Sequence, residues 1–171
     1  MRKLLDQYEI GLARKIVDDL FWKDLCDNYI EIVKERLYQP DKHGEEERKS
    51  AQYAIYYAIF TILKMYAIYT PHVTEYIYLK GFKDFEEEIS IHQTLWPQVS
   101  SVNENALRFG EQIKNAVFEM RKYKSDNNLS MRTEIDTFDI QGDISFESLF
   151  KETENDLLAC FHANSINYKL T

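Results

Sequence analysis

Apolar residues recur at helical spacing along the first third of the chain and predict a long helix over about residues 11–38. Its early apolar face holds Ala13, Ile16, Val17 and Leu20, and its later face holds Trp22, Leu25, Cys26, Tyr29 and Val33. The two faces overlap near Leu20 to Trp22, where the helix is apolar most of the way round. Because such a helix touches neighbours on several sides, we expect it to be the central rod of a bundle, with Trp22 in the core.

A second long helix is predicted from Glu45 to Tyr69, after a turn that contains Pro40 and Gly44. Its predicted core stripe consists of Ala51, Ala54, Ile55, Ala58, Ile59, Ile62, Met65 and Tyr69. The run approaches the length of a membrane span, but tyrosine hydroxyls and Lys64 within it argue for a helix between two others. The turn's His43 is interpreted as a solvated residue, because it has no neighbouring metal ligands.

Thr70 and Pro71 suit the N-cap and first position of a third helix, which should reach about Leu79. The segment from Ser90 to Pro97 is expected to be extended, because a residue before proline avoids the helical region. His92 within it is interpreted as a structural histidine bonded to the backbone. Trp96 either anchors the segment or stacks on a nucleic-acid base, and we favour the anchor.

The remaining sequence predicts a helix from Ser101 to Tyr123, with Ser101 at capping-box spacing from Glu104. Its stripe comprises Val102, Ala106, Phe109, Ile113, Ala116, Val117 and Met120. Strands over residues 131–140 and 164–170 flank a helix over residues 146–161, which implies a parallel pair with a helical crossover. The predicted fold is therefore mainly α, with a helical bundle over residues 1–98 and a small α/β appendage over residues 99–171.

Composition and charge restrict the function. The formal net charge of −8 argues against a generally basic nucleic-acid binder, but it leaves room for a local basic face. Cys26 and Cys160 lack metal-ligand spacing and are interpreted as buried free thiols, which suits a reducing cytoplasm. No phosphate-binding glycine loop and no Ser or Cys nucleophile in a recognisable setting is present, so we expect no catalytic site, no metal and no cofactor in the chain. The acidic residues of the first helix are best explained as a solvated or salt-bridged face.

Four stretches carry a family resemblance: Phe21–Glu31, Tyr69–Tyr78, Ser90–Pro97 and Lys124–Met131. In this order they resemble the anticodon-binding domain of class I aminoacyl-tRNA synthetases, especially that of the valyl-tRNA synthetase family. Two departures stand out: Asn28 occupies a place where the family often has tryptophan, and the family's first helix is incomplete at the N-terminus.

The resemblance implies a tRNA anticodon stem-loop recognition module of a valyl-tRNA synthetase-like protein. Such a module does not aminoacylate alone, because ATP and magnesium would belong to a catalytic domain outside this chain. The implied partners are tRNA, specifically valine tRNA, and the catalytic part of a valine–tRNA ligase. A cytoplasmic location and no membrane are expected, while the oligomeric state stays open.

Two surfaces are candidates for tRNA contact. On the first helix, Lys23, Asp27, Asn28 and Lys34 lie one or two turns apart and combine phosphate-binding lysines with groups that can read base edges. Trp96 is a weaker candidate for stacking. The second surface is the basic cluster of Arg121, Lys122 and Lys124, with Arg132 beyond it. Its alternative interpretation is a solubilising helix C-terminus that is favoured by the helix dipole.

An alternative function is a helical protein-interaction module. The groove left by an incomplete first helix would then pair with another chain. Binding to tRNA should weaken as salt rises, whereas a complex formed through an apolar groove should be insensitive to salt.

Overall fold

The structure is a computed structural model that describes residues 1–99 and 101–170. It is mainly helical, with one two-stranded sheet near the C-terminus, which confirms the predicted fold class. The described residues form two compact units, one containing residues 1–29 and 49–99 and the other containing residues 30–48 and 101–170. The domains expected from the sequence, residues 1–98 and 99–171, stay a prediction; the compact units differ from them in placing residues 30–48 with the C-terminal part.

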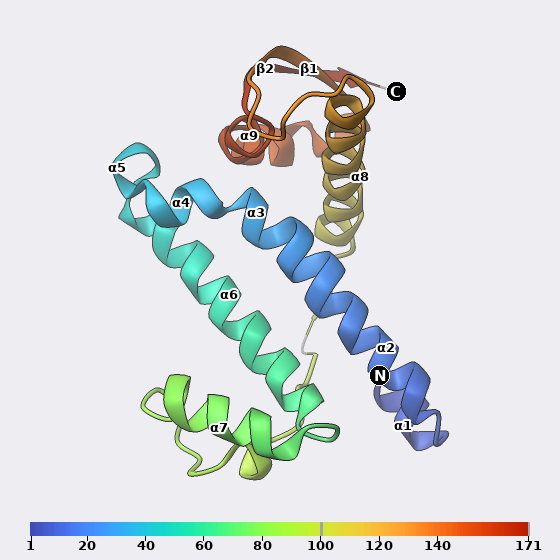
Figure 1. Cartoon of the computed structure of the whole chain (residues 1–171), viewed down its shortest axis with the longest axis vertical. Coiled ribbons are helices and arrows are strands. Elements are labelled where there is room, and N and C mark those ends of the chain that lie inside the picture. The colour runs from blue at the N-terminus through green and yellow to red at the C-terminus, as the bar shows by residue number, and fades with distance from the viewer. Residues whose placement is uncertain (100, 171) are drawn as a thin grey trace. The chain divides into compact units, whose positions relative to one another are not determined.

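The first unit is entirely helical apart from its connecting segments (Figure 1). Its elements are α1 (Arg2–Asp6), α2 (Ile10–Asp19), the π-helix η1 (Leu20–Tyr29), most of α6 (Glu45–Tyr66), α7 (Pro71–Gly81) and the short 3₁₀ helix η2 (Ile91–Gln93). Pro71 at the start of α7 confirms the predicted helix start. None of the described helices is both long enough and apolar enough to cross a membrane.

The π-helix η1 changes which side chains of the first predicted helix are buried. A π-helical hydrogen bond reaches one residue further than an α-helical one, so each turn holds more residues. Four residues therefore make slightly more than one full turn in α2 and slightly less than one full turn in η1. The two rotations around the helix axis have opposite signs and largely cancel. The side chains that face inward are accordingly spaced by four: Ala13, Val17 and Leu25 are buried, and Phe21 and Tyr29 are half-buried.

Trp22 lies off this line, and its predicted place in the core is wrong. The side chain is 59% exposed, and its ring meets the ring of Phe21 edge-on at 4.8 Å between centroids. The prediction failed because it extended a period of 3.6 residues through a segment that does not have that period.

The main core of the first unit lies between α6, α7 and η2. Phe60 and Leu63 of α6 pack against Tyr78, Phe82 and Ile91. The predicted stripe of α6 is confirmed at Ala51 and Ile62, but it missed Phe60 and Leu63, which are buried. Aromatic rings fill this core, with Phe60 and Phe82 stacked at 5.3 Å between centroids.

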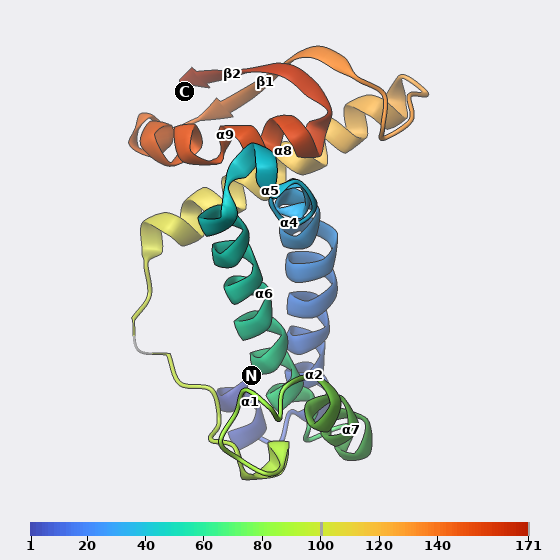
Figure 2. The same ribbon diagram turned by 90° about the vertical axis from the view of Figure 1, so that its left-hand side faces the viewer.

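The second unit combines short helices with an α/β layer. Its elements are α3 (Ile30–Ile32), α4 (Lys34–Tyr38), α5 (Pro40–His43), the first turn of α6, α8 (Glu104–Asp126), β1 (Ile135–Gly142), the 3₁₀ helix η3 (Ile144–Phe146), α9 (Glu147–Phe161) and β2 (Ala163–Leu170). β1 and β2 pair in parallel in a register that joins Ile135 to Ala163, and α9 is the crossover between them. The predicted strand–helix–strand unit is confirmed. Figure 2 shows the two strands lying over α8 and α9.

The core of the second unit lies between this sheet and the two helices. The stripe predicted for α8 is confirmed at its centre, because Phe109, Ile113, Ala116, Val117 and Met120 are buried. At the N-terminal end it is wrong: Val102 is 53% exposed, and Ala106 is exposed as well. The helix begins later than predicted, with Asn103 rather than Ser101 as the cap, since the Asn103 side chain accepts a hydrogen bond from the Ala106 amide at 3.0 Å.

A buried ion pair fixes the short helices of residues 30–48 to α9. Asp156 is 2% exposed, and its carboxylate accepts two hydrogen bonds from the guanidinium of Arg36, one of them from Nε at 2.6 Å. A second arm of Arg36 reaches Glu47 at 2.6 Å. Bidentate geometry of this kind orients both partners, so it positions α4 on α9.

Candidate nucleic-acid interface

The candidate residues of the π-helix occupy two different environments. Lys23 is exposed and pairs with Asp19 at 2.8 Å, while Lys15 reaches the same carboxylate at 3.0 Å. The hydrogen bonds from Lys23 and Lys15 lower the pKa of Asp19 below its ordinary value. Asp27 is exposed on the next turn. Lys23 and Asp27 thus present a cation and an anion on the surface of η1, four residues apart.

Asn28 is half-buried, and its side chain is engaged within the helix. Its Nδ2 donates a hydrogen bond to the carbonyl oxygen of Lys23, five residues earlier, at 2.7 Å. This spacing matches the reach of a π-helical hydrogen bond, so the side chain supports the local geometry. Asn28 was predicted to read a base edge, and its amide N–H group is directed to the protein backbone instead.

Trp96 follows η2 and is half-buried. Nearby, His92 Nε2 lies 3.3 Å from the carbonyl oxygen of Pro71, which confirms the interpretation of His92 as a histidine bonded to backbone. Glu75 of α7 accepts hydrogen bonds from the Ser90 hydroxyl at 2.9 Å and from the Ile91 amide at 3.1 Å. These contacts tie the start of the segment that carries Trp96 to α7.

In the second unit the predicted basic cluster does not form one surface. Lys122 is exposed and Arg121 is half-buried, but Lys124 is fully buried. Its ammonium group donates to the carbonyl oxygens of Met131, Thr133 and Phe161, at 2.8, 2.8 and 2.7 Å. Lys124 was predicted to contact tRNA, and this is a correction: a lysine whose ammonium is enclosed by three carbonyls cannot reach a phosphate. Burial also lowers its pKa.

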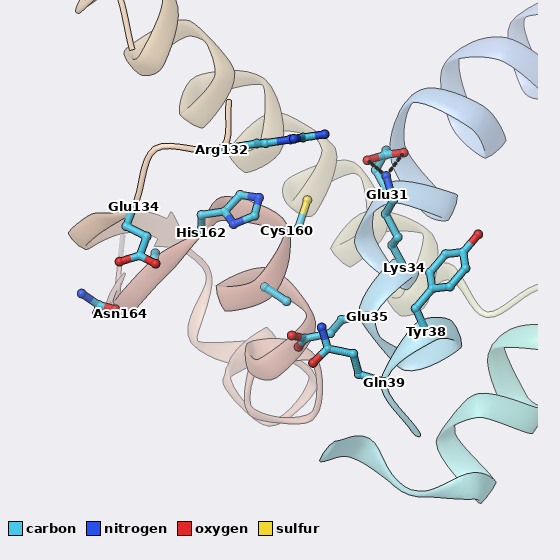
Figure 3. Close-up of a pocket in the computed structure, with 12 residues that line it drawn as sticks. Glu31, Lys34, Glu35, Tyr38, Gln39, Arg132, Glu134, Cys160, His162 and Asn164 are labelled. Atoms are coloured by element: carbon cyan, nitrogen blue, oxygen red, sulfur yellow. Dashed lines mark hydrogen bonds and ion pairs between the residues drawn. The ribbon is translucent and has the colours of Figure 1, made fainter. Parts of the chain in front are cut away.

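A pocket of about 580 Å³ lies in the second unit, between α3 and α4 on one side and the C-terminal end of α9 on the other (Figure 3). Its charged and polar lining comprises Glu31, Lys34, Glu35, Tyr38, Gln39, Arg132, Glu134, His162 and Asn164. The volume falls within the usual range for small-molecule or nucleotide sites. The pocket brings together Lys34 and Arg132, which the sequence had placed on separate candidate surfaces.

The charges in the pocket are mixed. Lys34 contacts both carboxylate oxygens of Glu31 at 3.1 Å. Glu35 accepts from Lys42 at 2.8 Å and lies 2.8 Å from His43 Nε2, and these contacts, that of Lys42 above all, lower the pKa of Glu35. A lining of this kind can offer carboxylates to base amino groups and cations to phosphates.

His43 is therefore not the solvated residue that the sequence suggested. Its side chain is 9% exposed and contacts Glu35. It also lines a second cavity of about 390 Å³, and Glu35, Ala159 and Ala163 line both cavities. The prediction was wrong because the short helix α5 folds His43 back towards Glu35, a contact that a loop assignment cannot anticipate.

The arrangement offers no activated nucleophile. Cys160 lines the pocket, but burial raises its pKa to about 11, with the Arg121 guanidinium offsetting part of the effect. The thiol is thus protonated near neutral pH and is a poor nucleophile. Among the described residues, no group of three or more His, Cys, Asp or Glu side chains is placed to hold a metal ion.

Sequence reasoning missed much of the polar pocket lining, including Tyr38, His162 and Asn164. Tyr38 is 78% exposed. The sequence does not distinguish it from the other tyrosines at helical positions, so only the structure identifies it as a pocket residue. His162 has a left-handed backbone (φ 51°, ψ 48°) as the C-cap of α9. Neither feature can be identified from spacing.

Comparison with known proteins gives a consistent result. A family described as "Anticodon-binding domain of tRNA ligase" matches residues 1–139. Similar proteins include a "Valine--tRNA ligase" of Pyrococcus abyssi, 33% identical over 90% of this chain, and one of Methanosarcina acetivorans, 37% identical over 82%. A third, from Orientia tsutsugamushi, is 32% identical over 96% of the chain. The matched parts cover 17%, 17% and 19% of these relatives, so the chain spans less than a fifth of their length.

Proposed function

Because this chain belongs to the family of anticodon-binding domains of tRNA ligases, we propose that it recognises the anticodon stem-loop of a valine tRNA. The observation that carries the proposal is the family match over residues 1–139, supported by relatives named valine–tRNA ligase that match most of the chain. In this proposal the chain works with the catalytic part of a valine–tRNA ligase in the cytoplasm. ATP and magnesium act in that catalytic part.

In this proposal two surfaces contact different parts of the tRNA. On η1, Lys23 and Asp27 contact the anticodon loop, where an acidic group discriminates between base edges and a lysine holds a phosphate. Asn28 supports them through its hydrogen bond to the Lys23 carbonyl, and Trp96 remains a candidate for stacking. In the second unit, Arg121, Lys122, Lys34 and Arg132 supply contacts to the phosphate backbone.

A tRNA titration of the purified chain at several salt concentrations tests the proposal. We expect a valine tRNA transcript to bind more weakly as salt rises, and a transcript with a substituted anticodon to bind more weakly than the wild type at every salt concentration. Replacing Arg121 and Lys122 together by alanine should weaken both transcripts equally. Replacing Asp27 by alanine should instead reduce the difference between them, by the equivalent of about 1–3 kcal/mol.

Equal binding of valine tRNA and of an unrelated RNA hairpin, at all salt concentrations, would overturn the assignment to tRNA. The Lys151→Ala variant provides a matched control for loss of a positive charge, because Lys151 is an exposed lysine of the second unit that pairs with Glu147 at 2.7 Å. We expect it to bind both transcripts as the wild type does.

One observation favours the second candidate function, a protein-interaction module. Leu12, Ile16 and Leu20, spaced by four residues on α2 and the start of η1, are 53%, 45% and 37% exposed. Exposed apolar side chains in a row are typical of a surface that another polypeptide covers. Sedimentation of the chain at low and high salt separates the two functions, since association through this row should not weaken as salt rises. Ile16→Asp places a charge in the middle of the row and should abolish the association.

A further inference from the structure

We propose that Lys124 is a positioning residue that holds Arg132 at the rim of the pocket, where Arg132 contacts the tRNA. The inference rests on the proposed tRNA function. It replaces the direct phosphate contact expected of Lys124 with an indirect role, and it assigns the direct contact to Arg132.

The first observation is the location of the three carbonyl groups that Lys124 binds. Two of them belong to Met131 and Thr133, the residues immediately before and after Arg132. The third belongs to Phe161, which immediately precedes His162. The ammonium group has three N–H donors, and the three distances of 2.7–2.8 Å account for all of them. One buried cation thus fixes the backbone on both sides of Arg132 and at the end of α9.

The second observation is that the loop around Arg132 is ordered by further local hydrogen bonds. The amide of Leu129 donates to the carbonyl of Lys124 at 2.8 Å, and the amide of Thr133 donates to the carbonyl of Ser130 at 2.9 Å. The amide of Arg132 donates to the Ser130 hydroxyl at 3.3 Å. The loop therefore closes around the ammonium group, and its backbone is held at both ends of the exposed arginine.

The third observation is the direction of the side chains. Arg132 is exposed and, with His162, lines the side of the pocket opposite Glu31 and Lys34 (Figure 3). Because the backbone on both sides of Arg132 is already held, binding a phosphate orders less of the loop than it would in a mobile loop, which favours tighter binding. The enclosed ammonium group of Lys124 cannot contact a phosphate itself, so its role is to position the backbone around Arg132.

The test measures binding of a valine tRNA transcript to the purified 171-residue chain by fluorescence anisotropy, at four salt concentrations. Arg132→Ala should weaken binding about 3- to 10-fold and reduce the salt slope by about 0.7–0.9, as expected for one lost phosphate contact. Lys124→Met, which keeps most of the unbranched side chain and removes its donors, should produce a loss of affinity and a change of slope of similar size. The affinity of the double variant for tRNA should equal that of the single variant with the lower affinity, because both changes remove the same contact.

A merely structural role would lower the unfolding midpoint of Lys124→Met but leave the salt slope of the folded protein unchanged. All titrations are therefore performed at a temperature at which circular dichroism shows each variant to be folded. Lys151→Met is the matched control, and we expect it to retain the wild-type slope. If Lys124→Met does not fold, Lys124→Arg takes its place. It keeps the charge, but its planar guanidinium cannot reproduce the three compact contacts, so it should show the same reduction in slope.

Additive losses in the double variant, or a wild-type slope in folded Lys124→Met or Lys124→Arg, would overturn the inference while leaving the tRNA function intact. Wild-type binding by Arg132→Ala would do the same. A wild-type chain that binds the transcript no better than an unrelated hairpin would instead refute the proposed function and this inference with it.

Discussion

Helix α8 and the π-helix η1 carry similar apolar patterns but bury different fractions of them. In α8 the period of 3.6 residues continues from Phe109 through Met120, and every predicted central position is buried. In η1 the same period places both Trp22 and Leu25 on the apolar face, whereas the structure buries Leu25 and leaves Trp22 exposed. Helical periodicity therefore predicts burial only where the hydrogen-bond pattern of the helix stays constant.

Lys124 lies on the continuation of the buried α8 stripe. Continuing the α8 stripe from Met120 by four residues leads directly to Lys124, which is buried at that position. The charge of the side chain suggested a surface role. Its position on the stripe directs it inward, and the carbonyl partners from other segments allow its charge to be buried there. The cost of burying it is offset by three carbonyl acceptors from the loop and the end of α9.

The largest expected effect concerns the regular helix. Phe109→Ala on α8 removes a ring that is 7% exposed and packs against Phe146, so it should lower the free energy of unfolding by about 3–5 kcal/mol. Phe118→Ala on the same helix is the control, because that ring is 62% exposed and its loss should cost less than about 1 kcal/mol. Urea unfolding monitored by circular dichroism gives both values. Equal losses would mean that α8 is rotated relative to the structure.

On η1, truncating Leu25 should destabilise the chain more than truncating Trp22, although the sequence suggests the opposite order. Leu25→Ala, at a position 4% exposed, should cost about 2–5 kcal/mol. Trp22→Ala removes a larger side chain but should cost less than about 1 kcal/mol, because the ring is 59% exposed. The same urea experiment measures both. A greater loss for Trp22 than for Leu25 would indicate that this segment is a regular α-helix.

A smaller effect should report on the π-helical geometry itself. Asn28→Ala removes the hydrogen bond to the Lys23 carbonyl and should destabilise the chain by about 0.5–1.5 kcal/mol. Asn115→Ala provides a control in α8, where the exposed side chain should contribute within about 0.5 kcal/mol. If the two variants unfold at the same urea concentration, the contact of Asn28 does not contribute to stability.

The smallest effect compares two cysteines, Cys26 of η1 and Cys160 of α9. Burial raises the pKa of both thiols, and that of Cys160 reaches about 11. A raised pKa reduces the thiolate fraction, so at pH 8 about one Cys160 side chain in a thousand should be ionised. Alkylation by iodoacetamide, followed in Cys26→Ala and Cys160→Ala variants, should be slower at Cys160 than at Cys26. Its rate should still rise between pH 8 and pH 10, and a plateau in that range would contradict the raised pKa.

The sequence by itself determined the class of the fold and the family. Long helical stripes, a proline at the start of α7 and a strand–helix–strand pattern are local features, and each appears in the structure. The four stretches that resemble synthetase domains predicted the family that the comparisons support. Local propensity and periodicity suffice for these features because they depend on residues close together in the chain.

Tertiary structure alone decided which residues stand at the candidate interface. The burial of Lys124 depends on carbonyl groups up to 37 residues away, and the contact of Arg36 with Asp156 joins positions 120 residues apart. The pocket likewise joins Lys34 to Arg132 and His162. A charged residue is placed on the surface or in the interior by the partners that satisfy its charge. Those partners come together only when distant segments fold, so no pattern along the chain reveals them.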